Sequence, residues 1–200
     1  MRQHYPNHAG ELIDGSRRNS NSDHRTPAKL FAALSLEVGG FTLDAAASAE
    51  NALCDEYFTQ ELNALVREWG TVEEPARVWC NPPYARDLNG GVGSWIAKAA
   101  SEVRSGRVSV AWLLLPARCS VKWFHDALQH STECRIIEGR LSFTGPFETD
   151  AGRTGGAPFG SVLFRFGGDS AGIMGANRQG QPQHKRYSNS QKSLDEWGAN

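Results

Sequence analysis

The spacing of apolar residues between positions 26 and 167 predicts an alternation of strands and helices. A first helix is expected from Thr26-Pro27 to Gly39-Gly40, because a capping residue precedes a proline and the next apolar residues recur at helical spacing. Strands are expected where short apolar or β-branched runs end at turn residues. The expected strands cover residues 41–44, 57–59, 78–80, 108–116, 134–143 and 160–166.

Helical spacing recurs between these strands. A helical stretch is expected to open at 48–51, and further helices are expected at 62–69, 95–103 and 123–128. The run 108–116 is continuously apolar, which is typical of a strand buried on both faces of a parallel sheet. The order of elements predicts an α/β fold with one Rossmann-like domain, whose doubly wound, mostly parallel sheet ends in an antiparallel strand pair.

The two ends of the chain differ in composition from its middle. Residues 1–25 and 168–200 are rich in Asn, Ser, Gln and Gly, and few of their residues are large and apolar. Burial there cannot offset the entropy cost of ordering the chain, so both segments are expected to be flexible tails. The expected domain is therefore 26–167, whose roughly 142 residues can bury about two thirds of the unfolded chain's surface in one core.

Composition excludes several classes of protein. The 21 Lys and Arg residues nearly balance the 22 Asp and Glu residues, so any contact with nucleic acid must be local. No apolar run approaches the ~18 residues of a membrane span, and the first ten residues lack the apolar stretch of a secretory signal, which predicts a cytoplasmic protein. The four cysteines show neither a CxxC pair nor zinc-ligand spacing, so no metal site is expected.

The sharpest chemical signal is the sequence Asn81-Pro82-Pro83-Tyr84 at the end of an expected strand. Prolines lack N–H donors, so this corner exposes carbonyls instead of pairing them in a sheet. If the Asn81 side-chain oxygen and the Pro82 carbonyl accept the two N–H groups of an aromatic amine or an amide, the nitrogen lone pair is freed for attack. Such preorganised dipoles are worth about 3 to 4 kcal/mol each. Tyr84 offers a face for stacking a base; the alternative is a merely rigid turn.

A second signal lies at the end of the strand expected at 41–44. Asp44 is followed by Ala45, Ala46 and Ala47, which are small enough for a ligand to approach the backbone. An acidic residue at this point of a doubly wound sheet is typical of a site for an adenosine-bearing cofactor, although the usual glycine fingerprint is absent.

In this order along the chain, the motifs resemble those of the phage-type DNA N6-adenine methyltransferases (Dam-like), which use S-adenosylmethionine. The resemblance spans about residues 26 to 167. Its motifs are ThrPro at 26–27 with Phe31, PheThrLeuAspAlaAlaAla at 41–47 with Asn51-Ala52, TyrPheThr at 57–59 with Asn63 and Leu65, ValTrpCysAsnProProTyr at 78–84, Trp95-Ile96 and Lys98-Ala99, LeuLeuProAlaArg at 114–118 with TrpPheHis at 123–125, GlyArgLeu at 139–141 with Phe143, and AlaProPheGlySer at 157–161.

The resemblance implies roles for particular residues. Thr26 and Pro27 would hold the amino-acid end of the cofactor, and Asp44, Ala45 and Ala46 would line its methionine or ribose part. Glu61 or Asn63 would replace the acidic residue that the family carries near position 62. The catalytic residues would be Asn81, Pro82, Pro83 and Tyr84.

Four cations are candidates for contacts with DNA. Arg118, Lys122 and Arg140 lie at or just beyond the ends of expected strands, on the side where ligands bind, and Arg86 lies in a glycine-rich loop. The alternative is that all four are solvated surface charges.

The resemblance implies an enzyme that moves a methyl group from S-adenosylmethionine to N6 of a flipped adenine in double-stranded DNA, as a monomer or weak dimer. If the protein is phage-encoded, the resemblance further implies that it acts in the cytoplasm of the bacterial host and protects phage DNA from restriction. Other readings stay open: a protein glutamine N5-methyltransferase, because a side-chain amide presents the same electronic problem, a non-catalytic DNA-binding remnant, and cytosine N4 methylation.

Overall fold

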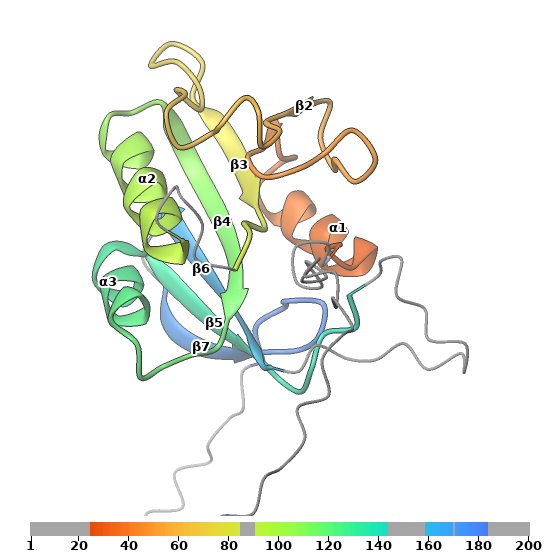
Figure 1. The fold of residues 1–200 in the computed structure, drawn as a ribbon. Helices are drawn as coiled ribbons and strands as arrows, with labels where there is room; N and C mark the ends of the chain where they lie inside the picture. Colours follow the sequence, from red (N-terminus) through yellow and green to blue (C-terminus); the bar gives the residue numbers. More distant parts are fainter. Residues whose placement is uncertain (1–24, 85–90, 144–158, 170, 184–200) are drawn as a thin grey trace, which may run out of the picture.

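The computed structural model describes residues 25–84, 91–143, 159–169 and 171–183 of the chain. Within these residues, seven strands form one sheet and three helices pack on it (Figure 1). The helices are α1 (Ala28–Glu37), α2 (Val92–Arg104) and α3 (Lys122–His130). The strands are β1 (Leu43–Asp44), β2 (Glu56–Tyr57), β3 (Ala76–Cys80), β4 (Val108–Pro116), β5 (Glu133–Ile137), β6 (Ser161–Gly167) and β7 (Gly172–Ala176).

The strands lie in the order β2-β1-β3-β4-β6-β5-β7. Strands β2, β1, β3 and β4 run parallel to one another, whereas β6 is antiparallel to both of its neighbours, β4 and β5. Strand β7 is parallel to β5. The carboxyl ends of every strand except β6 therefore meet at one edge of the sheet, which we call the carboxyl edge.

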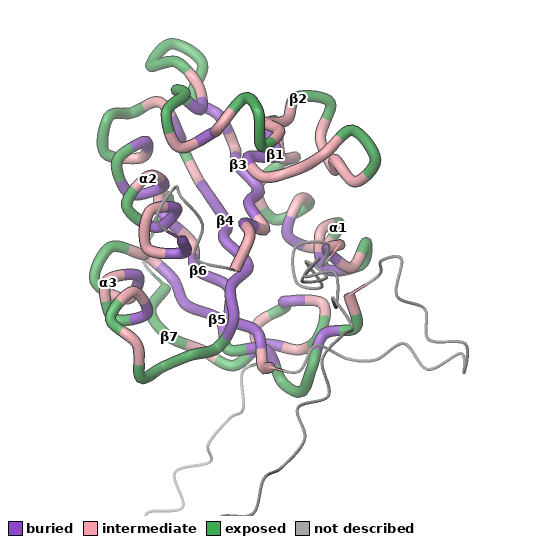
Figure 2. The backbone as a smooth tube through the Cα atoms, in the orientation of Figure 1, coloured by how far each residue is buried: buried purple, intermediate pink, exposed green. Residues whose placement is uncertain are grey.

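Helices cover both faces of the sheet (Figure 1). On one face, Leu30 and Leu34 of α1 pack with Trp79 and Trp112 of the central strands. On the other face, α2 and α3 pack against the remaining side chains of β3 and β4, including Val78 and Leu113. The central strands are accordingly buried on both sides (Figure 2), which confirms the interpretation of the apolar run 108–116.

The strand order reverses at the carboxyl edge, a point at which open α/β sheets form a crevice. From β1 the chain passes to β2 on one side and then returns to β3 on the other side. In an open α/β sheet, ligands bind outside the carboxyl ends of strands at such a reversal. Asp44 is the last residue of β1, and Asn81 directly follows β3, so both lie at this point.

Two of the expected helices are absent. Residues 48–51 form a single turn, in which the Ser48 N–H donates to the Asn51 Oδ1 at 2.7 Å. Residues 62–69 form turns without a helix, because Asn63 has a φ of 51° and its side-chain oxygen accepts the Leu65 N–H at 3.2 Å. Such local side-chain bonds compete with helical hydrogen bonds.

The strands near the C-terminus also differ from the expectation. Strands β5 and β6 are antiparallel as expected, but the edge of the sheet is β7, in a segment expected to be a flexible tail. Strand β7 pairs along its whole length with β5, and Ala176 also forms a bridge with Pro182. The sheet therefore extends past the boundary expected at residue 167, because pairing with β5 stabilises a segment whose own composition is poor in apolar residues.

In the described part of the chain, no helix combines the length and apolarity that crossing a membrane requires.

Candidate active site

Hydrogen bonds hold the side chain of Asn81 from two directions. Its Nδ2 donates to the Oγ1 of Thr26 at 3.2 Å, and its Oδ1 accepts from the hydroxyl of Tyr84 at 2.7 Å. Thr26 is buried just before α1, so the start of that helix and the end of β3 meet at this amide. Thr26 is buried and Tyr84 is half-buried, and their two hydrogen bonds together fix the orientation of the amide plane.

Two prolines shape the corner that follows Asn81. Neither Pro82 nor Pro83 has an N–H, so the chain cannot continue the ladder of β3 beyond Cys80. The Tyr84 hydroxyl lies 3.3 Å from the carbonyl oxygen of Leu114 in β4, which also accepts from it. Burial raises the pKa of Tyr84 above its ordinary value, so its hydroxyl stays protonated and able to donate at neutral pH.

The ring of Tyr84 lies beside a second aromatic ring. Its centroid is 5.6 Å from that of Phe159, at an interplanar angle of 77°, an edge-to-face contact. The ring centroid of Phe143 lies 6.5 Å from that of Phe159. Phe159 is missing from the site residues predicted from the sequence; the signal that points to it is the motif at 157–161, which ends in the first residue of β6.

Asp44 is a buried carboxylate at the end of β1. Its Oδ1 accepts the Ala46 N–H at 3.3 Å, and its Oδ2 accepts the Leu53 N–H at 3.2 Å. Burial raises the pKa of Asp44 to about 6, although these two hydrogen bonds oppose the rise. A cation placed near this group would favour its charged form, so the position suits a positively charged ligand.

The cysteines near Asp44 do not offer reactive thiolates. Burial raises the pKa of Cys54 to about 12, and it raises that of Cys80 well above the ordinary value, with a further contribution from the Asp44 charge. Both thiols are therefore protonated at neutral pH. Among the described residues, no group of three or more His, Cys, Asp or Glu side chains could hold a metal ion.

The other residues predicted to bind the cofactor contribute to the structure of the segments in which they lie. Pro27 occupies the N-cap position of α1. Glu61 is exposed and hydrogen-bonded to the Thr59 side chain, which lowers its pKa. Asn63 is half-buried and turns the segment through its contact with Leu65. Ala45 and Ala46 follow Asp44 at the crevice, where Ala45 donates its N–H to the Trp79 carbonyl at 2.9 Å.

Three of the four cations predicted to contact DNA lie among the described residues. Arg118 follows β4 and Arg140 follows β5, so both are exposed near the carboxyl edge. Lys122 begins α3, and its ammonium group lies 2.7 Å from a carboxylate oxygen of Asp126. Arg86 lies outside the described residues.

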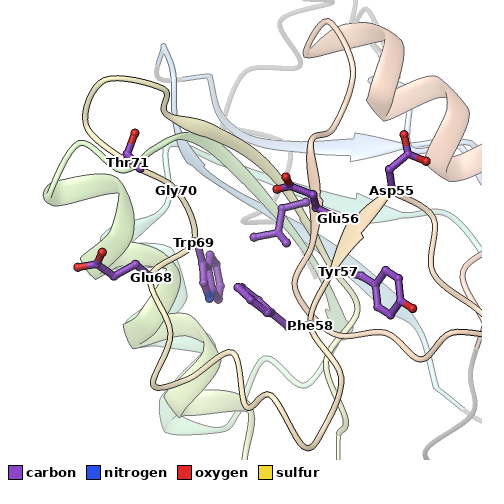
Figure 3. Close-up of a pocket in the computed structure, with 9 residues that line it drawn as sticks. Asp55, Glu56, Tyr57, Phe58, Glu68, Trp69, Gly70 and Thr71 are labelled. Atoms are coloured by element: carbon purple, nitrogen blue, oxygen red, sulfur yellow. The ribbon is translucent and has the colours of Figure 1, made fainter.

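A cavity of about 560 Å³ lies at β1, β2 and the segment that precedes β3 (Figure 3). The rings of Phe58 and Trp69 lie close together in it, and the carboxylates of Glu56 and Glu68 flank them. The other lining residues are Leu43, Asp55, Tyr57, Gly70 and Thr71. Neither Asp44 nor Asn81 lines this cavity, so the polar corner and the cavity are separate features.

Comparison with known proteins bears on this corner. A family model described as DNA N-6-adenine-methyltransferase (Dam) matches residues 16–176, a range that ends with the last residue of β7 and includes Asp44 and Asn81.

Two relatives were also found. The chain is 33% identical over 176 residues to the DNA N-6-adenine-methyltransferase of Escherichia phage T1, which covers 81% of this chain and 66% of the relative. It is 37% identical over 62 residues to "Putative methyltransferase YfdM" of Escherichia coli (strain K12), which covers 30% of this chain and 68% of that protein. The chain thus spans slightly less than two thirds of the phage protein's length.

Proposed function

The chain belongs to the DNA N-6-adenine-methyltransferase (Dam) family, and from this membership we propose that it transfers a methyl group to the N6 amine of an adenine in double-stranded DNA. The observation that carries the proposal is the orientation of the Asn81 amide, whose nitrogen is held by Thr26 and whose oxygen faces Tyr84. That oxygen lies in the corner that the two prolines form at the carboxyl edge.

The chemistry requires an unreactive nitrogen to become a nucleophile. The lone pair of an amine on an aromatic ring is delocalised into that ring. If the Asn81 Oδ1 and the Pro82 carbonyl each accept one N–H, the nitrogen is drawn toward tetrahedral geometry and its lone pair is released. The same dipoles stabilise the positive charge that grows on nitrogen, and because they are already oriented they need not reorganise during the reaction.

We propose S-adenosylmethionine as the methyl donor. When bound, it supplies a methyl group on a positively charged sulfonium, which an amine can attack directly. Asp44 fits such a ligand, since its buried carboxylate gains from a nearby cation, and Ala45 and Ala46 leave the backbone open to approach. Thr26 and Pro27 would hold its amino-acid end, and Glu61 or Asn63 its ribose. The reversal of the strand order between β1 and β3 supports this position.

The target base must leave the duplex to reach this corner. Flipping a base out of the stack costs a few kcal/mol, and stacking on an aromatic ring can offset about 1 to 3 kcal/mol. Tyr84 and its neighbour Phe159 are the aromatic rings at the corner, and Arg118 and Arg140 offer contacts for phosphates beside it. No general base is assigned, because the proton can leave nitrogen during or after transfer.

The experiment that tests this function compares acceptors. The purified protein is incubated with isotopically labelled S-adenosylmethionine and either duplex DNA or a glutamine-containing peptide. We expect label only in the DNA. Label in the peptide would instead identify a protein glutamine methyltransferase, and the absence of cofactor binding in calorimetry at millimolar concentration would identify a non-catalytic remnant.

A further inference from the structure

The carboxyl edge carries a row of arginines that continues far beyond Asn81. Arg118 follows β4, Arg140 follows β5 and Arg178 follows β7, and all three are exposed. Since β4, β5 and β7 all end at this edge, the three residues follow one another along it in the order of the strands. Among the described residues, no carboxylate forms an ion pair with any of them.

Arg178 packs against the turn that carries Arg140. A Cβ atom placed on Gly139 would lie 3.0 Å from the Nη2 and 3.2 Å from the Nε of Arg178. The guanidinium group therefore lies directly on the backbone of Gly139, at a residue whose φ of 75° favours glycine. The Glu138 N–H donates to the Ala176 carbonyl at 2.8 Å, so the two turns are also joined through their backbones. The turns that carry Arg140 and Arg178 are thus held together.

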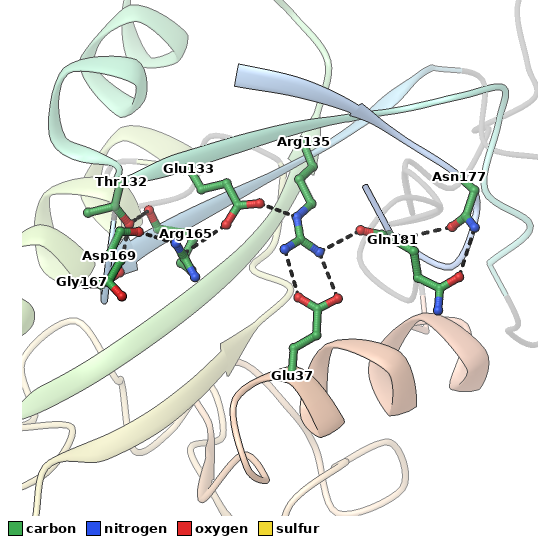
Figure 4. Close-up of polar contacts among 10 residues, drawn as sticks. Glu37, Thr132, Glu133, Arg135, Arg165, Gly167, Asp169, Asn177 and Gln181 are labelled. Carbon is green, nitrogen blue, oxygen red and sulfur yellow. Dashed lines mark hydrogen bonds and ion pairs between the residues drawn. The ribbon is translucent and has the colours of Figure 1, made fainter. Parts of the chain in front are cut away.

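The turn that holds Arg178 is rigid. The Asn177 Oδ1 accepts the N–H groups of Gln179 and Gln181, at 2.9 and 3.0 Å. The Gly180 carbonyl accepts from the Nη1 of Arg135 at 2.8 Å. This arginine is nearly fully buried, and in Figure 4 its guanidinium lies between the carboxylates of Glu37 and Glu133.

A buried ion network of this kind is weak evidence for stability, because desolvation opposes the attraction of the charges. The consequence of the network around Arg135 is that it holds three parts of the fold in fixed positions. Arg135 donates to Glu37 on α1, to Glu133 on its own strand and to the turn after β7. The guanidinium group of Arg135 thereby fixes the position of the turn after β7 relative to the sheet and to α1. Arg178 belongs to this turn, so its backbone is held in place.

We propose that Arg178, with Arg140 and Arg118, forms a phosphate-binding row along which the duplex lies beside the target adenine. This inference rests on the proposed function. From β3, which carries Asn81, to β7 there are four strand spacings, or roughly 19 Å at about 4.8 Å each. At about 3.4 Å per base pair, Arg178 meets phosphates roughly five to six base pairs from the flipped base. Three exposed cations that form no ion pair among the described residues suit a polyanion and offer nothing to an apolar partner.

The test is the salt dependence of DNA binding by Arg178→Ala, measured by fluorescence anisotropy on a duplex with ten base pairs on each side of one target. The slope of log affinity against log salt is negative, and losing one phosphate contact should reduce its magnitude by about 0.9. The same loss should weaken binding about eightfold at 0.1 M salt. On duplexes cut to three base pairs on either side in turn, one of the two cuts should abolish the difference. The control is Arg104→Ala, because Arg104 ends α2 at the opposite edge of the sheet.

A second pair of variants separates the contact from a folding defect. Gly139 and Gly172 have similar positive φ values, 75° and 73°, so alanine strains the backbone alike at both. Only at Gly139 would the new Cβ atom displace Arg178, since nothing lies within 4 Å at Gly172. We expect Gly139→Ala to change the slope in the same direction as Arg178→Ala, by no more than that variant does, and Gly172→Ala to keep the original slope.

An unchanged slope in Arg178→Ala, or an equal loss on all duplexes, would overturn the phosphate-binding row. The proposed function is judged separately, by whether the unsubstituted protein methylates the long duplex in the same preparation.

Discussion

At the scale of single residues, the Asn81 amide is oriented by two hydroxyl groups, one from a distant part of the chain and one from the corner that follows Asn81. Thr26 lies 55 positions before Asn81, and Tyr84 lies three positions after it. The sequence predicts Asn81 and Tyr84 from the motif alone and gives Tyr84 a stacking face. It cannot reveal that the Tyr84 hydroxyl donates to Asn81 or that Phe159 lies beside the ring, because both contacts depend on how β3, β4 and β6 pack.

A substitution at Tyr84 distinguishes two roles of this residue, orienting the Asn81 amide through its hydroxyl and stacking the target base on its ring. Tyr84→Phe keeps the ring but removes the hydrogen bond to Asn81, and a hydrogen bond of this kind contributes about 0.5 to 1.5 kcal/mol. We expect kcat to fall about 2- to 12-fold with the KM for DNA nearly unchanged. Steady-state kinetics measures this, with Tyr57→Phe, a half-buried tyrosine of β2, as the control. A rise in KM alone would show that the hydroxyl does not orient Asn81.

Asp44 gives a prediction on pH. Burial raises its pKa to about 6, so in the free protein it is largely protonated below that pH, and the stability this protonation contributes is lost as the pH rises through 6. A cation bound beside Asp44 favours the charged form, so the affinity for S-adenosylmethionine should fall as the pH drops below 6 and level off above 7. Calorimetry from pH 5 to 8 measures it. Asp44→Asn should lose this dependence; a wild-type affinity that is flat with pH would place the cofactor elsewhere.

At the scale of elements, a buried carboxylate joins an irregular segment to a helix. Glu102 of α2 is fully buried and accepts from the Trp69 N–H at 3.2 Å and from the Arg107 Nε at 2.7 Å, and it also bonds Lys98. Burial opposes its ionisation, but the hydrogen bonds from Arg107, Lys98 and Trp69 prevail and lower its pKa to about 2. This network takes the place of the helix expected over 62–69.

Glu102→Gln should therefore destabilise the protein by about 2 to 3 kcal/mol, because it removes charged hydrogen bonds inside the fold. Urea unfolding at pH 7 measures the loss. The matched control is Asp126→Asn, which breaks the exposed pair with Lys122 and should cost at most about 1 kcal/mol. Equal effects of the two substitutions would contradict the role given to Glu102. The contribution of Glu102 should itself decline as the pH falls from about 4.5 toward 2.

The elements differ in how far the sequence predicts them. Strand β4 and helices α2 and α3 follow from strong apolar patterns, and the structure confirms them. Residues 62–69 carry a helical pattern of apolar residues, yet Leu62 and Val66 are exposed and Asn63 adopts a positive φ. There, local hydrogen bonds and the indole of Trp69, which donates to the Ala64 carbonyl at 2.9 Å, override the pattern. Strand β7 is the converse case, because it is a strand that the sequence does not predict. Its two glycines weaken the local strand pattern, and it is pairing with β5 that stabilises the extended conformation.

At the scale of the whole molecule, the sheet brings the site and its surroundings to one edge. The reversal between β1 and β3 places Asp44 and Asn81 side by side in strand order, and the later strands extend the same edge with arginines. The segment after residue 169 belongs to this architecture, because it supplies β7 and the Gly180 carbonyl that Arg135 binds.

Two shortened chains test that conclusion. A chain ending at residue 169 leaves the edge of β5 unpaired and removes a hydrogen-bond partner from buried Arg135, so it should lose roughly 3 to 5 kcal/mol. In a protein of this size the loss corresponds to a drop in Tm of about 6 to 20 °C. A chain ending at residue 183 keeps these contacts and serves as the control. Thermal unfolding of both measures the difference; equal Tm values would restore the domain boundary at residue 167.

The most direct measurement is mass spectrometry of nucleosides from DNA treated with S-adenosylmethionine and either the unsubstituted protein or Asn81→Ala. The account predicts N6-methyladenine from the unsubstituted protein and a rate at least about 100-fold lower from Asn81→Ala, with cofactor affinity nearly intact. Methylation of cytosine, or undiminished N6-methyladenine from the variant, would contradict the claim that the amide of Asn81 and the corner behind it make the target amine reactive.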